Sequence, residues 1–155
     1  MAESRRLLVI HNPTAGRRRR RRLDAVLHLL AEAGCTITLV PTAKRGDAED
    51  FAATAIADDV DLLVAAGGDG TLNEVANGLV RRRELGLPPL PLAIVPLGTA
   101  NVLAAEIGLP EDAEAIARTI LTGAPRRIYP GIANGRRFLC MAGSGLDAFV
   151  VQDVN

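Results

Sequence analysis

The sequence predicts an α/β fold in which helices cover both faces of a parallel sheet, followed by the first strands of a second, β-rich domain. Between residues 6 and 122, short apolar runs alternate with longer segments whose apolar residues recur at the spacing of one helical face. Such β-then-α units with short loops are typical of a three-layer arrangement. After Gly123 the alternation stops, and Asn134-Gly135 between two further runs predicts an antiparallel hairpin.

The composition excludes several classes of protein. The 155 residues carry no formal net charge, 48% are hydrophobic, and 3% are aromatic with no tryptophan. The length is that of one ordinary domain with a sizeable core. So few aromatic residues argue against a surface that stacks nucleic-acid bases, and we expect no nucleic-acid partner.

The cysteines and the polar N-terminus bear on the compartment. Cys35 and Cys140 lie inside apolar runs and are interpreted as buried thiols in a reducing compartment. No apolar run reaches the about 18 residues that a membrane span needs. The polar start, Met1 to Arg6, does not resemble a signal peptide. We therefore expect a cytoplasmic protein.

The first strand is predicted over residues 6–11, and Asn12 to Gly16 form a turn because Asn-Pro and Gly are strong turn signals. Six arginines follow, Arg17 to Arg22. They form a solvated loop and first helical turn, or one or two of them reach a triphosphate while the rest are surface, or they make a basic patch for nucleic acid or anionic membrane. A helix follows, with its apolar face at Leu23, Val26, Leu27, Leu30 and Ala31, and Gly34 is its expected C-cap.

The middle of the chain continues the same pattern. Residues 36–40 form a β-branched strand, and residues 41–47 form the loop at its end. A third set of apolar residues predicts a helix containing Ala48, Phe51, Ala52, Ala55 and Ile56. The apolar run from Val60 to Ala66, with Asp61 inside it, predicts the next strand.

That strand leads into Gly67-Gly68-Asp69-Gly70-Thr71 and then into a helix with apolar residues Leu72, Val75, Ala76, Leu79 and Val80. Thr71 and Glu74 have the spacing of a capping box. Backbone N–H groups and a positive helix dipole meet at such a strand-to-helix turn, so it favours anions. The carboxylate of Asp69 would repel a phosphate unless a cation lies between them or the carboxylate acts on a substrate proton.

The remaining elements complete the sheet and begin the hairpin. Arg81 to Glu84 end the glycine-turn helix, residues 92–95 form a fourth strand, and Pro96 to Asn101 form the turn after it. A short helix carries Ala100, Leu103, Ala104 and Ile107, and Pro110 begins another with Glu111 and Asp112 in its first turn. Residues 126–132 and 136–141 are the expected hairpin strands. We expect an α/β domain over residues 1–124 and the incomplete start of a second domain over residues 125–155.

Four turns converge on one edge of the predicted sheet, because the carboxyl ends of parallel strands share an edge. These are the turns at 12–16, 42–47, 67–71 and 96–101, and all are rich in Gly, Thr and Asn. One such turn could be only a chain reversal. Four together predict a binding site.

These motifs resemble a known family. Asn12-Pro13 followed by Gly16, then Gly67 to Val75, then Pro96-Leu97-Gly98-Thr99-Ala100-Asn101, are similar in sequence and order to the diacylglycerol kinase catalytic domain. The family includes bacterial lipid kinases and sphingosine kinases and resembles NAD kinases distantly. The resemblance implies a Rossmann-like nucleotide domain, a β-rich acceptor domain, and transfer of the γ-phosphate of ATP to a lipid hydroxyl with Mg²⁺.

The resemblance also implies site residues. The expected nucleotide-binding residues are Asn12, Pro13, Gly16, Thr42, Gly67, Gly68, Asp69, Gly70, Thr71, Asn73, Glu74, Gly98, Thr99 and Asn101. Asp69 would be catalytic, facing the γ-phosphate and the acceptor hydroxyl, and Asp147 would lie on the acceptor side. Other readings stay open: Glu74 as a helix cap, Thr42 as a loop cap, and Asp147 as the end of a strand. His11 and His28 are interpreted as structural.

Two features depart from the family. Val102 follows Asn101 where the family often has an acidic residue, and the chain stops at Asn155 before most of the β-rich domain. We therefore expect a truncated lipid kinase that binds ATP but turns over poorly, with peripheral membrane contact at the inner face. The alternatives are a nucleotide-binding module without catalysis, an NAD-kinase-like small-molecule kinase, and an interaction protein that uses Arg17 to Arg22.

Overall fold

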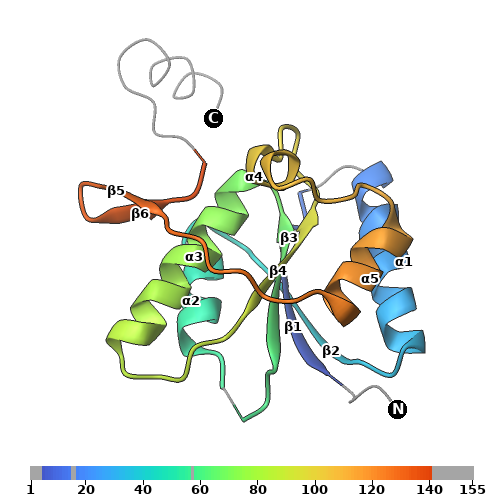
Figure 1. Ribbon diagram of the computed structural model, residues 1–155, viewed down its shortest axis with the longest axis horizontal. Coiled ribbons are helices and arrows are strands. Elements are labelled where there is room, and N and C mark those ends of the chain that lie inside the picture. The colour runs from blue at the N-terminus through green and yellow to red at the C-terminus, as the bar shows by residue number, and fades with distance from the viewer. Residues whose placement is uncertain (1–4, 15–16, 57, 141–155) are drawn as a thin grey trace.

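Four parallel strands form the sheet at the centre of the structure (Figure 1). The computed structural model describes residues 5–14, 17–56 and 58–140. The strands are β1 (Arg6–His11), β2 (Thr36–Pro41), β3 (Leu62–Gly67) and β4 (Leu92–Pro96). They lie in the order β2-β1-β3-β4, so β1 and β3 are the central pair. The predicted parallel sheet is confirmed.

Helices cover both faces of this sheet. Figure 1 shows α1 (Arg17–Glu32) and α5 (Ala113–Thr122) on one side, with α2 (Asp47–Thr54) and α3 (Asp69–Glu84) on the other. The short helix α4 (Val102–Glu106) lies near the carboxyl end of the sheet. Among the described residues, no helix combines the length and the apolar character needed to cross a membrane.

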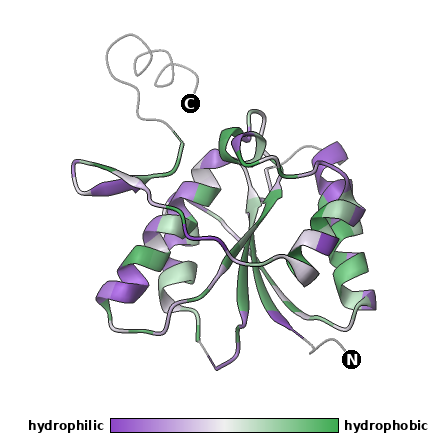
Figure 2. Ribbon diagram, in the orientation of Figure 1, coloured by the Kyte–Doolittle hydropathy of each residue, from purple (hydrophilic) through white to green (hydrophobic). Residues whose placement is uncertain are grey.

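Alternation along β1 divides the core into two clusters. Leu7 and Val9 pack with residues of α1 and α5, whereas Leu8 and Ile10 pack with residues of α2 and α3. Successive side chains of a strand point to opposite faces, so a strand that is apolar throughout is buried on both. Figure 2 shows the strands largely in the hydrophobic colour and the helices in mixed bands.

The strand predicted from Val60 begins two residues later, at Leu62, because Asp61 has another role. Its carboxylate accepts hydrogen bonds from the Arg6 backbone N–H at 2.7 Å and from the Arg6 guanidinium at 2.6 Å. The guanidinium lowers the pKa of Asp61 to about 2. This ion pair joins the start of β1 to the start of β3.

Two helix boundaries also differ from the prediction. α2 ends at Thr54, and Ile56 lies beyond it with 64% of its surface exposed. α5 begins at Ala113 rather than Pro110, because the Asp112 side chain is its N-cap and accepts a hydrogen bond from the Ala115 N–H at 2.8 Å. An N-cap aspartate satisfies a backbone donor that the helix itself leaves unpaired.

α3 presents a rotated face to the core. The buried residues are Leu72, Val75, Asn77, Gly78 and Arg82, whereas Ala76, Leu79 and Val80 are only half-buried. The rotation brings Gly78 against α2, where an added Cβ would lie 2.3 Å from the Glu49 carbonyl oxygen. A bare glycine therefore allows the two helices to approach at this point.

Arg82 is buried rather than a surface charge at the helix end. Only 1% of its surface is exposed. Its guanidinium donates to the Pro88 carbonyl at 2.6 Å and to the Ala55 carbonyl. Arg82 thus joins the segment after α2 to the loop that leads into β4.

The predicted hairpin is present but shorter. It consists of β5 (Gly131–Ala133) and β6 (Arg136–Phe138), joined by Asn134 and Gly135. These two residues have φ of 49° and 76°, the left-handed values that a type I′ turn requires. Gly131 lies opposite Phe138, whose ring occupies the space that a Cβ would need.

Replacing Gly78 with alanine should destabilise the fold by about 1–3 kcal/mol, because the added methyl group overlaps backbone rather than a flexible side chain. The measurement is the urea midpoint of unfolding. Gly70→Ala in the same helix is the matched control, since an added Cβ there meets nothing within 4 Å. Equal midpoints for the two variants would contradict the close α2–α3 approach.

Candidate functional site

The strand order fixes where a ligand can bind. β2 lies beside β1 on one side of the central pair, and β4 lies beside β3 on the other side. At such a switch point the loops after the two central strands diverge and leave a crevice at their carboxyl ends. The turns after β1, β3 and β4 all lie at this edge.

The turn after β3 depends on two bare glycines. β3 ends at Gly67, and Gly68 is the N-cap of α3. A Cβ on Gly67 would lie 2.5 Å from Oγ1 of Thr71, so the threonine side chain fills that space. The predicted capping box is wrong, because α3 begins at Asp69, ahead of Thr71, and its cap makes no side-chain hydrogen bond.

The turns after β3 and β4 meet backbone to backbone. A Cβ on Gly98 would lie 2.4 Å from the Gly68 Cα, and a Cβ on Gly68 would lie 3.0 Å from the Gly98 Cα. Asn101 shapes the second turn: its side-chain oxygen accepts from the Gly98 N–H at 2.7 Å, and its amide donates to the Gly98 carbonyl at 2.9 Å. Asn101 itself has a left-handed φ of 48°.

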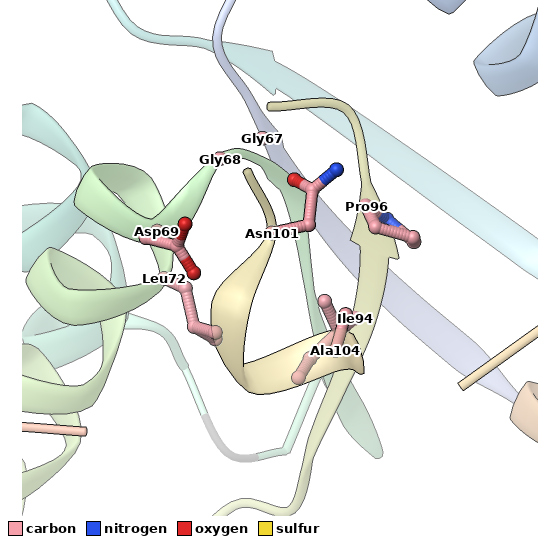
Figure 3. Close-up of a pocket in the computed structure, with 8 residues that line it drawn as sticks. All are labelled: Gly67, Gly68, Asp69, Leu72, Ile94, Pro96, Asn101 and Ala104. Carbon is pink, nitrogen blue, oxygen red and sulfur yellow. The ribbon is translucent and has the colours of Figure 1, made fainter. Parts of the chain in front are cut away.

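Asp69 lies in the hollow that these turns form. Figure 3 shows its carboxylate at the start of α3, facing the segment that leads into α4. The hollow is lined by Gly67, Gly68, Asp69, Leu72, Ile94, Pro96, Asn101 and Ala104. The Leu103 N–H donates weakly to Asp69 Oδ1 at 3.4 Å, and the Cys140 thiol lies 3.7 Å from the same oxygen.

Cys140 was expected only as a buried thiol, and its contact with Asp69 is new. Burial, and then the charge of Asp69, raise the pKa of Cys140. The neutral thiol is therefore the favoured form and can donate a weak hydrogen bond to the carboxylate. The two residues are 71 positions apart, so no local pattern in the sequence could have paired them.

The residues predicted after β1 and β2 shape the rim of the crevice. Asn12 accepts hydrogen bonds from the Thr14 N–H at 3.0 Å and from its hydroxyl at 2.8 Å, which forms a tight Asx turn beside the exposed Pro13. Thr42 donates from its N–H to the His11 carbonyl at 2.9 Å. Burial, and then Arg20, lower the pKa of His11, which favours a neutral imidazole.

Two of the six arginines reach the turn after β4. Arg19 donates to the Thr99 hydroxyl at 3.2 Å, and Arg22 donates to the Pro96 carbonyl at 3.1 Å. Arg19 and Arg22 lie one helical turn apart on α1, so both face the same loop. They bring positive charge to the edge of the crevice.

The other predicted site residues have less direct positions. Asn73 and Glu74 lie on α3 and are half-buried, and the Asn73 side-chain oxygen is buried with no partner among the described residues. Gly70 is exposed, with open space where a Cβ would be. Gly16 and Asp147 lie outside the described residues. The structure thus brings the residues from the turns after β3 and β4 together most closely.

Comparison with known proteins assigns the family. A family model for the diacylglycerol kinase catalytic domain matches residues 6–132, and the chain belongs to this family. The chain is 39% identical over 151 residues to a diacylglycerol kinase from Bacillus subtilis strain 168, covering 96% of this chain and 48% of that protein. A diacylglycerol kinase from Staphylococcus saprophyticus is 39% identical over 142 residues, which are 90% of this chain and 45% of that one.

A solved structure shares the fold. The crystal structure of a diacylglycerol kinase from Bacillus anthracis strain Sterne superposes with a TM-score of 0.69 at 30% sequence identity. The superposition covers 90% of this chain and 50% of that one. The chain thus spans about half the length of the relatives that it matches.

Gly98→Ala should open the contact between the two glycine turns, because its Cβ cannot be placed without moving Gly68. The expected cost is about 1–3 kcal/mol of unfolding free energy. Amide exchange should also become faster at Leu97, whose N–H donates to the Gly67 carbonyl at 2.9 Å. Ala100→Ser, at an exposed neighbour in the same turn, is the control. Unchanged exchange at Leu97 in the Gly98 variant would contradict the geometry.

Proposed function

We propose that this chain carries the nucleotide-binding part of a kinase that transfers the γ-phosphate of ATP to a lipid hydroxyl. The observation that carries the proposal is the carboxylate of Asp69 at the N-terminus of α3, in a hollow bounded by two bare glycine turns. Membership of the diacylglycerol kinase family supports the kinase class and favours a diacylglycerol-like acceptor over a nucleotide or sugar.

We expect a phosphate chain to bind along this edge of the sheet. The space beside Gly70 is open, so phosphate oxygens can approach the N–H groups at the start of α3. Arg19 and the Thr99 hydroxyl would donate from the opposite side. Oriented N–H groups and a guanidinium are suited to stabilising the charge of a transferring phosphoryl group.

The residues present also fit a Mg²⁺ ion that is shared with the nucleotide. Within the described part of the chain, no group of three or more His, Cys, Asp or Glu side chains could hold a metal. Magnesium is commonly held by one or two carboxylates together with substrate phosphates and waters. Asp69 would be the protein ligand, and the bound ion would neutralise charge on the phosphates.

Asp69 has a second role in the proposal, which is to orient or deprotonate the acceptor hydroxyl. A positioned general base of this kind contributes about 10²–10⁴-fold to the rate. The acceptor would enter from the side of the hairpin, where residues 125–155 would begin the second domain and Asp147 would contribute. Peripheral contact with a bilayer would present the lipid hydroxyl to this side.

The proposal is tested by binding and by single-turnover transfer. Titration calorimetry with Mg·ATP measures affinity, and labelled ATP with excess protein and diacylglycerol in mixed micelles measures transfer. Binding together with lipid phosphorylation supports the proposal. Binding without transfer to diacylglycerol fits either a part of a lipid kinase that turns over poorly by itself or a nucleotide-binding module, and absence of binding would overturn both.

Asp69→Asn should lower the single-turnover rate by about 10²–10⁴-fold, because the amide can neither accept a proton nor ligate Mg²⁺ as strongly. ATP affinity measured without Mg²⁺ should stay the same or rise, since a negative charge near the phosphates is removed. Asp112→Asn, at the N-cap of α5, is the matched control, because asparagine caps helices equally well. Equal rates for both variants would remove Asp69 from the chemistry.

Arg19→Ala should weaken ATP binding about tenfold, since a charge-assisted hydrogen bond to a phosphate is lost. The neighbouring and exposed Arg18 offers a control with the same change in net charge. Arg18→Ala should change the affinity by about twofold or less, because a solvated charge is screened. If both variants bind ATP equally well, Arg19 makes no specific contact with the nucleotide and contributes only to the overall positive charge of α1.

A further inference from the structure

The middle of α3 holds the hairpin through one buried side chain, Asn77. Only 7% of its surface is exposed. Its Oδ1 accepts a hydrogen bond from the Arg137 N–H at 3.0 Å, and its Nδ2 donates to the Arg137 carbonyl at 3.0 Å and to the Asn73 carbonyl at 2.8 Å. One amide thus satisfies both backbone groups of a residue 60 positions away.

The register of the hairpin explains why these groups are available. Ala133 pairs with Arg136 beside the two-residue turn, and Ile132 pairs with Arg137. In a two-residue hairpin the pair beside the turn exchanges hydrogen bonds, and the next pair does not. The N–H and carbonyl of Arg137 therefore point away from β5, and Asn77 takes the place that a third strand would occupy.

The residues that follow Arg137 lie along α3, from Asn77 toward Asp69. Arg137 lies beside Asn77, and three residues later the Cys140 thiol lies 3.7 Å from Asp69 Oδ1. Leu139 and Cys140 pack against the core cluster that contains Leu72 of α3. Residues 137–140 thus follow α3 back toward its N-terminus, from the hydrogen bonds of Arg137 with Asn77 to the contact of Cys140 with Asp69.

We propose that Asn77 is a positioning residue for Asp69. By fixing the backbone of Arg137, it places the Cys140 thiol against Asp69 Oδ1, the oxygen that the Leu103 N–H also contacts. One oxygen of the carboxylate is then contacted by groups from two segments, α4 and the segment after β6. The consequence of this orientation for catalysis rests on the function proposed above for Asp69.

The chemistry of the contact requires an amide. Asparagine offers a donor and an acceptor in one plane, whereas aspartate lacks the donor and alanine lacks both. A second contact between hairpin and helices, from Arg136 to Glu49 at 2.7 Å, joins β6 to α2 through more exposed side chains. This pair is bidentate and the Glu49 side chain is only 18% exposed, so the ion pair and Asn77 together hold β6.

The test measures the reactivity of two cysteines in the same chain. Iodoacetamide labels Cys140, beside Asp69, and Cys35, which packs in the cluster on the other face of the sheet. Peptide mass spectrometry gives the ratio of the two labelling rates. Asn77→Ala should raise the Cys140:Cys35 ratio about tenfold or more, because the segment after β6 opens locally while the sheet stays folded.

Two further variants make the result specific. Arg137→Pro removes the N–H that donates to Asn77 but no hydrogen bond of the hairpin, since proline is tolerated where a strand N–H faces away from its partner. It should raise the ratio as Asn77→Ala does. Arg136→Gln removes the ion pair with Glu49 and leaves the hydrogen bonds of Asn77 in place, so it should raise the ratio less than Asn77→Ala does.

The proposal is overturned if the Cys140:Cys35 ratio stays at the wild-type value in both the Asn77 and the Arg137 variant. This includes the case in which both cysteines are labelled faster by the same factor, because the ratio then does not change. The labelling needs no nucleotide, so its result is independent of whether ATP binds. In the transfer assay, Asn77→Ala should lower the single-turnover rate while ATP affinity stays within about threefold, since only the orientation of Asp69 changes. Equal losses of rate and affinity would count against positioning.

Discussion

The close approach of Gly68 and Gly98 is the constraint on which the functional edge depends. With no Cβ between them, the turns after β3 and β4 lie backbone to backbone, and Asn101 fixes the second turn through both polar groups of Gly98. α3 and α4 begin from these turns, so their relative placement follows from the glycine contact. Asp69 and the Leu103 N–H are brought together as a result.

α3 joins this edge to the rest of the molecule. Its first residue is Asp69. In the middle of the helix, Asn77 contacts the hairpin and Gly78 packs against α2, and in its last turn Arg82 contacts two loops. Each of these contacts is with backbone atoms of another segment. A single rigid helix therefore sets the positions of the carboxylate, the hairpin and the neighbouring helix at once.

Much of the fold could be predicted from local patterns, because apolar runs and helical spacing record burial directly. The sheet, most helix spans and the Asn134-Gly135 turn were predicted correctly. Asn77 and Arg82 were not, since a polar residue inside an apolar helix face gives no sign of partners that lie far along the chain. The capping box was wrong because Gly68 is the N-cap and the helix already begins at Asp69. The catalytic roles of the site residues stay predictions.

The strand order has a consequence for how the chain is made. β1 precedes the other three strands of the sheet in the chain, yet it is central and pairs with β3, which follows Asp61, 55 residues after Arg6. Until β3 has left the ribosome, one side of β1 has no partner and its apolar residues lack their neighbours. Productive folding of the sheet therefore waits until β3 has emerged, and slow translation would prolong the exposure of a strand suited to aggregation.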